Sequence, residues 1–422
     1  MAGVLAQSAF RRLWTANLAG GFGGQFATFA MSVTAVLVLG AGAGEVGVIA
    51  AAAQVGWLSS LLVGVWVDRW RRRSTLLWAS WTRCVALLSV ALAYLTGVLT
   101  VTHLAVVALV LGLCDVFFLT AHDAIVPVLV GRNRVTEARA RLQVGDQAVQ
   151  AGGAGVAGQL LRWLPGPLLY LVSAVLELVS GVLLLSVRVD EQKADRVGRE
   201  PFAVALRVGL RHVVRHPVLR ALLVRNAVVN SGAGMLMALL PVYVLDDLRV
   251  SAPAYGLVVS IGAVAGILAA ALALRVVATV GDLRVVVVAT VALPLGVVVI
   301  PVAAVVPSAA FVLLSGAECL IAAVLTVSQV ATSGVRAAVT PDAVMGRVSA
   351  ASRFVTLGVL PLAALAGGWL GSSVGHIGTL FVAAGLMVVA GGLTVASPLR
   401  AHRRLPDAWR VPDTVEPRPG LL

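Results

Sequence analysis

The sequence predicts an all-α membrane protein in which twelve transmembrane helices form two pseudo-symmetric six-helix bundles. Of the 422 residues, 59% are apolar and only 12% are charged, whereas soluble domains are about 45–50% apolar and about 25% charged. The apolar residues gather in runs of about 20, the length that crosses a bilayer core about 30 Å thick. The 32 Lys and Arg residues stand mostly between these runs, where they act as topology signals.

The apolar runs place twelve predicted spans in order along the chain. Because Phe10 to Trp14 lead directly into the first span, we expect no cleavable signal peptide. The first six spans are predicted at 17–39, 45–66, 75–97, 103–124, 143–163 and 167–187. The second six are predicted at 221–245, 254–274, 285–306, 308–334, 354–373 and 377–397.

The distribution of basic residues predicts the orientation. One alternate set of loops holds 28 of the 32 basic residues, and the opposite set holds only Arg162 and Arg249. Because cytoplasmic loops carry the excess of Lys and Arg, both termini are predicted to be cytoplasmic. Nearly all of the basic residues are arginine, which is typical of a high-GC bacterial genome. We therefore expect a multi-pass protein of the bacterial inner membrane.

The same pattern divides the chain into four regions. Residues 1–187 and 221–397 are predicted to form the N-terminal and C-terminal six-helix bundles. Residues 188–220 form the one long polar stretch between spans and are predicted to be a cytoplasmic linker. A surface helix is expected in this linker from Phe202 to Val214, because apolar residues recur there at helical spacing. The tail, 398–422, is rich in Pro and Arg and is expected to be disordered.

No enzyme or cofactor motif occurs in a suitable context. A Gly-x-Gly-x-x-Gly string at Gly153, Gly155 and Gly158 lies inside a predicted span, where small residues let helices approach closely. The single lysine, Lys193, follows Gln192 rather than Gly, which excludes a Walker A loop. The six histidines lack metal-ligand spacing. We therefore expect no enzyme activity, no cofactor, no metal site and no nucleic-acid partner.

A polar motif, Gly64 to Arg73, stands between the second and third predicted spans. Gly64 permits close helix contact, Asp68 can accept hydrogen bonds from the N-terminal amides of another helix, and Arg72 can reach a neighbouring carboxylate. A simpler interpretation is a set of topology-setting arginines after a chance aspartate. The spacing favours the first interpretation.

This stretch resembles the signature loop of the major facilitator superfamily, Gly-x-x-x-Asp-Arg-x-Gly-Arg-Arg, with Arg71 where the family prefers Gly. The resemblance implies the twelve-helix fold of that superfamily and a transport function. It also implies a conformational gate on the cytoplasmic side. The gate residues are predicted to be Gly64, Asp68, Arg69, Arg72, Arg73, Asp123, Gly346 and Arg347. In this scheme Asp68 meets the amides near Ser349 to Ser352, and Arg72 meets Asp123, when the cytoplasmic side closes.

Within the superfamily the chain is similar to the drug-efflux branch that includes macrolide exporters and the enterobactin exporter. The stretches that carry this likeness are 10–14, 112–118, 255–257 and 341–348. Two departures stand out. The fifth span has Ala154 to Gln159 where antiporters carry Gly-Pro-x-x-Gly-Gly, so the proline is missing. The first span has Gly23-Gly24-Gln25 where the branch tends to have an acid early in the span, so a coupling carboxylate must lie elsewhere.

Ionisable residues within the spans are functional candidates, because a charge inside a membrane is costly unless it is paired or faces a cavity. Glu177, Glu318 and Asp115 lie near the middle of the sixth, tenth and fourth spans, and the loss of hydration favours their proton-bound forms. Asp115 and Glu318 are the preferred pair, because the fourth and tenth spans occupy similar places in the two halves. Alternatively, Arg83 neutralises Asp115. Asp123 and Asp146 are expected to pair with arginines of the 67–73 loop.

Polar faces on two further spans complete the candidate set. Asn226, Asn230 and Gly234 recur at every fourth residue of the seventh span, and Glu318 and Gln329 share a face of the tenth. Such faces either line a central cavity or form hydrogen bonds between helices without a ligand. The candidates for proton coupling or substrate binding are Asp115, Glu318, Glu177, Gln25, Asn226, Asn230 and Gln329.

These observations favour a monomeric, gradient-driven exporter of a hydrophobic or amphiphilic small molecule, such as an antibiotic, siderophore or secondary metabolite. We expect two halves that rock about a site at the bilayer midplane, with H+ as the coupling ion. Two alternatives to an exporter remain. The first is a facilitator or importer of the same architecture, and the second is a membrane sensor or scaffold that does not transport.

Overall fold

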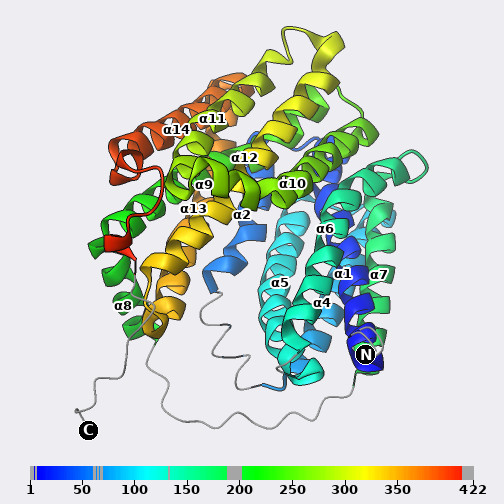
Figure 1. The fold of residues 1–422 in the computed structure, drawn as a ribbon. Coiled ribbons are helices and arrows are strands. Elements are labelled where there is room, and N and C mark those ends of the chain that lie inside the picture. Colours follow the sequence, from blue (N-terminus) through cyan, green and yellow to red (C-terminus); the bar gives the residue numbers. More distant parts are fainter. Residues whose placement is uncertain are drawn as a thin grey trace.

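The computed structural model describes residues 4, 7–59, 63, 66, 70–131, 134–187 and 202–410 of the chain. The regular elements of these residues are all helical (Figure 1). Ten of the helices are long and apolar enough to cross a membrane. They coincide with ten of the twelve predicted spans, and the all-α prediction is confirmed.

The other two predicted spans do not appear as long apolar helices within the described residues. The span predicted at 45–66 begins with α2 (Ala43–Val55) and a short 3-10 turn, η3 (Gly56–Ser59), and residues 60–62, 64 and 65 lie outside the described residues. The span predicted at 143–163 lies within α6 (Val135–Leu160), whose first turns carry charged residues. Both helices pack within the bundle nonetheless.

The described part of the N-terminal half contains six long helices in chain order. Its first helix, α1, ends in a π-helical turn, η2 (Thr34–Val38). α1 packs on α6 and α7, α4 packs on α5 and α7, and α2 packs on α5. The helices are α1 (Ser8–Val33), α2 (Ala43–Val55), α4 (Arg72–Leu95), α5 (Val101–Val130), α6 (Val135–Leu160) and α7 (Leu169–Leu185).

The C-terminal half repeats this plan. Its first helix, α9, also ends in a π-helical turn, η6 (Tyr243–Asp247). α9 packs on α13 and α14, while α12 packs on α10 and α11. The helices are α9 (Pro217–Val242), α10 (Ala252–Val280), α11 (Asp282–Val302), α12 (Ala310–Val339), α13 (Asp342–Val374) and α14 (His376–Ala396).

The two halves keep a common register in their first helices. α1 begins at Ser8 and α9 at Pro217, and α5 begins at Val101 and α12 at Ala310, so both pairs start 209 residues apart. Helix boundaries follow local signals: Thr100 and Ser251 cap α5 and α10 through their side chains. Gly131 and Gly281 end the same helices at φ 76° and 100°, which glycine adopts without strain.

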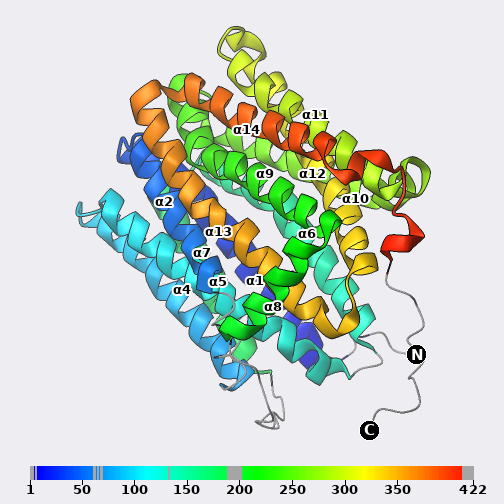
Figure 2. The same cartoon turned by 90° about the vertical axis from the view of Figure 1, so that its left-hand side faces the viewer.

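The halves meet at one end of the bundle and diverge toward the end that carries the start of α1 and the helix at 202–215 (Figure 1). We call these the distal end and the terminal end. The largest contacts between the halves are those of α2 with α13 and of α6 with α10, and α2 also packs on α9. Figure 2 shows α2 and α13 running side by side.

The segment between the halves contains α8 (Phe202–Arg215), the surface helix expected from its apolar spacing. It packs on α13 and α9. Residues 188–201 of the predicted linker lie outside the described residues, and the limits of the four predicted regions stay a prediction.

The start of the tail is ordered, contrary to our expectation of disorder from Pro398 onward. Leu399 and Leu405 are buried against the C-terminal half. The backbone N–H of Leu405 donates to Asp282 Oδ1 at 2.9 Å, and the Arg404 guanidinium donates to the carbonyl of Ala278 at 2.8 Å. Arginines that cap the last carbonyls of a helix, here α10, stabilise its C-terminus. Residues 411–422 lie outside the described residues.

Candidate functional site

A buried charge cluster lies inside the N-terminal half, centred on Arg83 of α4. Arg83 Nη2 is 2.7 Å from Glu177 Oε1 of α7, and Arg83 Nη1 is 3.3 Å from Asp115 Oδ1 of α5. The guanidinium also lies 5.9 Å from the centre of the Phe118 ring, within reach of a cation–π interaction. One cation thus joins three helices and serves two carboxylates.

Glycines of α1 leave the space that this cluster occupies. A Cβ on Gly24 would lie 2.9 Å from Arg83 Nη2, and a Cβ on Gly23 would lie 3.0 Å from the carbonyl of Ser173 in α7. Because larger residues would collide there, the Gly23-Gly24 pair lets α1 pack directly over the charges. Gly23 and Gly24, which precede Gln25, therefore have a structural role.

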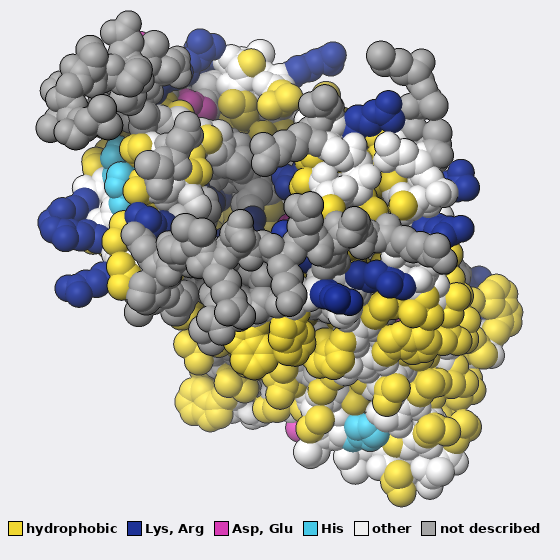
Figure 3. All heavy atoms as spheres, turned by 90° about the horizontal axis from the view of Figure 1, so that it is seen from below, with side chains coloured by type: hydrophobic (Ala, Val, Ile, Leu, Met, Phe, Trp, Pro, Cys, Tyr) yellow, Lys and Arg dark blue, Asp and Glu magenta, His cyan; other side chains and the backbone are white. Residues whose placement is uncertain are grey.

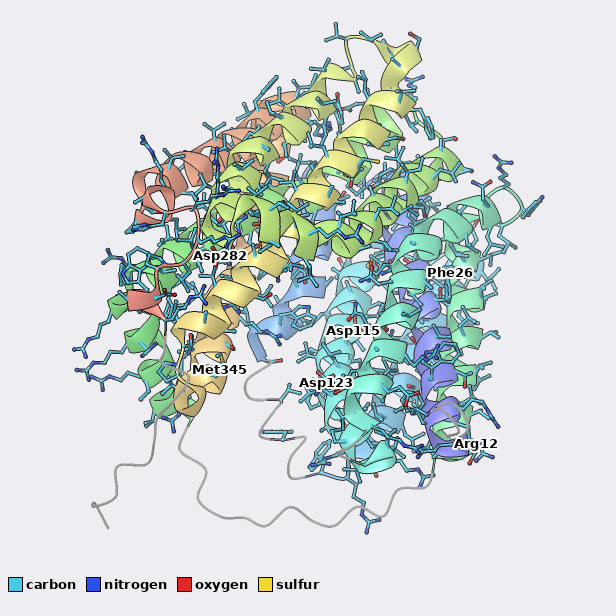
Figure 4. The ribbon with its side chains drawn as sticks, viewed as in Figure 1. Arg12, Phe26, Asp115, Asp123, Asp282 and Met345 are labelled. Carbon is cyan, nitrogen blue, oxygen red and sulfur yellow. The ribbon has the colours of Figure 1, made fainter. Side chains whose placement is uncertain are left out.

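The two carboxylates differ sharply in exposure. The side chain of Glu177 is fully buried, whereas that of Asp115 is 51% exposed. Figure 4 shows Asp115 and Asp123 on α5, with Met345 across from them at the start of α13. Asp115 is thus the accessible member of the cluster, and Glu177 is the enclosed one.

The preferred pair from the sequence, Asp115 and Glu318, is not brought together. Glu318 lies on α12 in the other half and is half-buried against α10. A Cβ on Gly262 of α10 would lie 2.9 Å from the Cβ of Glu318. Within the described residues, Glu318 makes no hydrogen bond or ion pair. Asp115 instead shares Arg83 with Glu177. The alternative interpretation, in which Arg83 neutralises Asp115, named the first of these contacts and missed the second.

A second buried guanidinium, that of Arg225 on α9, was given no role by the sequence reasoning. Its Nε donates to Thr290 Oγ1 at 2.8 Å, its Nη2 to Ser328 Oγ at 2.6 Å and its Nη1 to Asn226 Oδ1 at 2.7 Å. Arg225 is only 4% exposed. Its partners are neutral and come from three helices, so Arg225 ties α9 to α11 and α12.

The remaining polar candidates have separate surroundings. Asn230 donates to the carbonyl of Thr356 at 2.6 Å, which links α9 to α13. Gln25 lies against Gly153 of α6, where a Cβ would approach Gln25 Cβ to 2.6 Å. Gln329 is exposed on α12. The structure therefore places these residues on helix–helix contacts and surfaces rather than in one cluster, and their functional roles stay predictions.

The gate residues are only partly within the described chain. Gly64, Asp68 and Arg69 lie outside it. Arg72 donates to the carbonyl of Ala124 at 2.9 Å, and no ion pair joins it to Asp123 in the described part of the chain. The Arg72–Asp123 contact is expected only when the cytoplasmic side closes, so it stays a prediction. In this structure the Asp123 side chain is exposed, while the next carbonyl along α5 faces α4.

Two further expectations about this end of the molecule are wrong. Asp146 accepts a hydrogen bond from Asn17 Nδ2 of α1 at 2.8 Å rather than pairing with an arginine of residues 71–73. The helix expected to begin near Ser349 begins at Asp342, so the amides of 349–352 lie within helical turns. Gly346 faces open space, and the carbonyl of Arg347 packs against Gly209 of α8.

The distal end of the bundle is closed by close backbone approaches. A Cβ on Gly47 of α2 would lie 2.8 Å from the carbonyl oxygen of Ala364 and 2.9 Å from Gly368 Cα, both on α13. A Cβ on Gly256 of α10 would lie 3.0 Å from Gly158 Cα on α6. Gly47 and Gly256 are also 209 residues apart, so the two contacts are related by the repeat.

Apolar and aromatic side chains occupy the meeting surface just inside this closure. The rings of Phe29 on α1 and Tyr255 on α10 are 5.6 Å apart. Gln54 Nε2 of α2 lies 3.3 Å from Met237 Sδ of α9. This surface between the halves suits an apolar or amphiphilic molecule more than a strongly hydrated one.

Comparisons with known proteins agree with this architecture. A family model described as transmembrane secretion effector matches residues 2–414. Over 173 residues the chain is 28% identical to an uncharacterized MFS-type transporter, YvqJ, of Bacillus subtilis (strain 168). That match covers 40% of this chain and 41% of the length of the relative.

Solved structures of several transporters share the fold. The nucleoside transporter NupG has a TM-score of 0.74 at 14% identity, covering 93% of this chain and 99% of that one. A bacterial homologue of the iron transporter ferroportin, in an inward-facing state, has a TM-score of 0.73 at 18% identity, covering 94% and 99%. A D-xylose-proton symporter has a TM-score of 0.69 at 14% identity, covering 91% and 96%. At such identities the likeness establishes the fold.

Proposed function

Since the chain belongs to the transmembrane secretion effector family of major facilitator superfamily transporters, we propose that it exports a hydrophobic or amphiphilic small molecule in exchange for protons. The proposed substrates are those of the drug-efflux branch: an antibiotic, a siderophore or a secondary metabolite. The protein acts as a monomer in the bacterial inner membrane, with both termini in the cytoplasm.

The Arg83 cluster is the observation that carries this proposal. When Asp115 and Glu177 are both ionised, the cluster holds one uncompensated negative charge within the membrane. When one of them binds a proton, the cluster is neutral, which a low-dielectric surrounding favours. Asp115, with its side chain 51% exposed, exchanges the proton with the space between the halves. Movement of Arg83 toward one carboxylate favours the ionised form of that carboxylate and releases its proton, while the other carboxylate binds one.

The arrangement of the halves supports a transport cycle by alternating access. Contacts at Gly47 and Gly256 close the distal end, while the halves diverge at the terminal end (Figure 1). Viewed from below, this terminal face carries many more Lys and Arg side chains than Asp and Glu (Figure 3). An excess of basic residues is typical of cytoplasmic faces, so we assign the open end to the cytoplasm.

The test measures uphill and downhill transport by the purified protein in liposomes. A host that lacks its own efflux pumps, with and without the chain, first identifies a transported compound from drug-susceptibility profiles. Variants Asp115→Asn and Glu177→Gln are then expected to lose proton-driven uphill transport and to keep downhill exchange of that compound. Glu318→Gln tests whether the unpaired carboxylate of α12 couples as well.

A matched carboxylate outside the cluster serves as the control. Glu45 is exposed at the start of α2, and its side chain accepts a hydrogen bond from the Gly42 N–H at 3.1 Å. Glu45→Gln is expected to keep uphill transport. If Asp115→Asn, Glu177→Gln and Glu318→Gln all retain full uphill transport, coupling by intramembrane carboxylates is excluded. The chain is then a facilitator or a carrier driven by another ion.

A further inference from the structure

The outer face of α8 carries a concentration of positive charge without acidic partners among the described residues. Arg207, Arg211 and Arg215 are all exposed. Among the described residues, no hydrogen bond or ion pair holds their side chains. From residue 202 to residue 245 the chain contains no Asp or Glu. The charge of this face is therefore balanced by something outside the described structure.

The opposite face of α8 fixes the helix to the C-terminal half. Gly209 packs against the backbone carbonyl of Arg347 at the start of α13, too closely for any larger residue. Val213 is 1% exposed and belongs to the apolar core at this end of the half. The orientation of α8 is thus set by backbone contact, and its arginine face is held outward.

The position of α8 places this face at the edge of the bilayer. α8 lies on the outside of the bundle, at the terminal end (Figures 1 and 2). After one intervening residue, α9 begins at Pro217 as one of the helices that can cross a membrane. Arg215 therefore lies two residues before a helix that can cross a membrane, and Arg220 is exposed in the first turn of that helix.

The exposed face of α8 is also partly apolar. A helical face that contacts only water usually carries polar side chains. Val204 and Val214 are 45% and 47% exposed. With Arg207 and Arg211 between them, they recur at spacings of three and four residues along one side of the helix. Alternating valine and arginine on an exposed helical face is the pattern of a helix that lies in the interface of a membrane.

We propose that this face, Val204, Arg207, Arg211, Val214 and Arg215, is a binding site for the headgroups of anionic phospholipids. The guanidinium groups hydrogen-bond the phosphate oxygens, for which their planar fork is well suited, and the valines contact the first carbons of the acyl chains. Topology-setting charge alone would need neither the ordered helix, nor its backbone contact with α13, nor the exposed valines. Because α8 is fixed to α13, bound lipid also restrains the terminal end of a helix that contacts the other half.

The test compares lipid retention by the full-length protein. Delipidated protein in detergent is incubated with equal amounts of phosphatidylglycerol and phosphatidylcholine that have the same acyl chains. Native mass spectrometry then gives the ratio of the two lipids bound. Wild type is expected to prefer phosphatidylglycerol. Each arginine near a charged surface contributes about fivefold in affinity, so Arg207→Gln with Arg211→Gln and Arg215→Gln should reduce the preference by about a hundredfold.

Two controls separate this site from general electrostatics and from misfolding. Arg11→Gln with Arg139→Gln and Arg141→Gln removes the same charge from exposed arginines at the terminal end of the other half, and it is expected to keep the preference. The variant Arg207→Lys with Arg211→Lys and Arg215→Lys keeps the charge of α8. It is expected to keep most of the preference for phosphatidylglycerol. An unchanged ratio in the α8 glutamine variant, or an equal loss in the control on the other half, overturns the proposal.

Discussion

The distal contact between α2 and α13 offers a direct way to shift the conformational equilibrium. Gly47 lies where a Cβ would meet the Ala364 carbonyl oxygen at 2.8 Å and Gly368 Cα at 2.9 Å. Both neighbours are backbone atoms, so no side-chain rotation relieves the collision. In Gly47→Ala the two helices must move apart by about half an ångström to reach an ordinary contact. Only conformations with a closed distal end contain this contact.

The cost of such overpacking is about 1–3 kcal/mol. Because the collision is absent when the distal end is open, this cost falls on one state of the cycle and shifts the equilibrium by about 5-fold to 150-fold toward the other. Gly47→Ala is therefore expected to populate the distally open state. Its transport rate should fall, because each cycle must restore the disfavoured closed contact.

The assay measures a distance across the distal end by electron–electron resonance. Spin labels are placed at Gly42 and Ser373, which are exposed on opposite halves, after replacement of the three native cysteines by alanine. The protein is reconstituted in lipid nanodiscs. Wild type is expected to show mainly a short distance, and Gly47→Ala a new, longer one.

Gly44→Ala is the matched control, one turn earlier on the same helix. A Cβ there would lie 3.8 Å from Ser372 Oγ and 3.9 Å from the Gly368 carbonyl oxygen, which are ordinary contacts. This variant is expected to keep the wild-type distance and rate. An unchanged distance distribution in Gly47→Ala, or an equal change in Gly44→Ala, would refute the reasoning.

Three further predictions concern the terminal end and the orientation. Asp68→Asn should slow transport while leaving expression and substrate binding largely intact, and a wild-type rate would reduce the 64–73 motif to a topology signal. A cysteine at Gly42 should react with an impermeant thiol reagent from outside intact cells and one at Lys193 should not; the reverse pattern contradicts cytoplasmic termini. Burial, and then the neighbouring His212, lower the pKa of His216, so the folded state resists protonation there. The stabilising contribution of neutral His216 is present above the ordinary histidine pKa and is lost as the pH falls. Between pH 7.5 and 5.5, the unfolding temperature of His216→Gln should therefore fall less than that of wild type. Equal falls in the two proteins would exclude His216 as a cause of the pH dependence.

The fold could be predicted because each span leaves a separate signal in the sequence. A run of about 20 apolar residues is required wherever a helix crosses the bilayer core. The helix ends were less predictable, because α5 and α10 continue past the predicted ends at 124 and 274 to Val130 and Val280. The tail was harder to predict. Pro and Arg are typical of disordered termini, but Leu399 and Leu405 bury themselves against the C-terminal half. Two leucines in a polar segment give no periodic signal.

The partners of the charged residues were less predictable than their depth. Residue depth follows from counting along a span, but the rotation of one helix against the next does not. The alternative pairing of Arg83 with Asp115 occurs, and the structure adds the closer contact of Arg83 with Glu177 at 2.7 Å. The partners of Arg225 left no signal, because Thr290 and Ser328 are common, uncharged residues of membrane helices.

The repeat explains why pairing Asp115 with Glu318 failed. The sequence argument took the two carboxylates as equivalent, because α5 and α12 hold equivalent places in the two halves. These helices start 209 residues apart, so the equivalent of Asp115 is Val324, and Glu318 stands six residues earlier, about 9 Å along the helix. The repeat preserves the glycines that close the distal end, Gly47 and Gly256, but it does not preserve the charges. Asp115 and Glu318 differ in depth, and Glu318 does not share Arg83. Replacing Asp115 therefore leaves the surroundings of Glu318 unchanged, and the reverse also holds. Each of the two variants thus reports on its own carboxylate in the transport cycle.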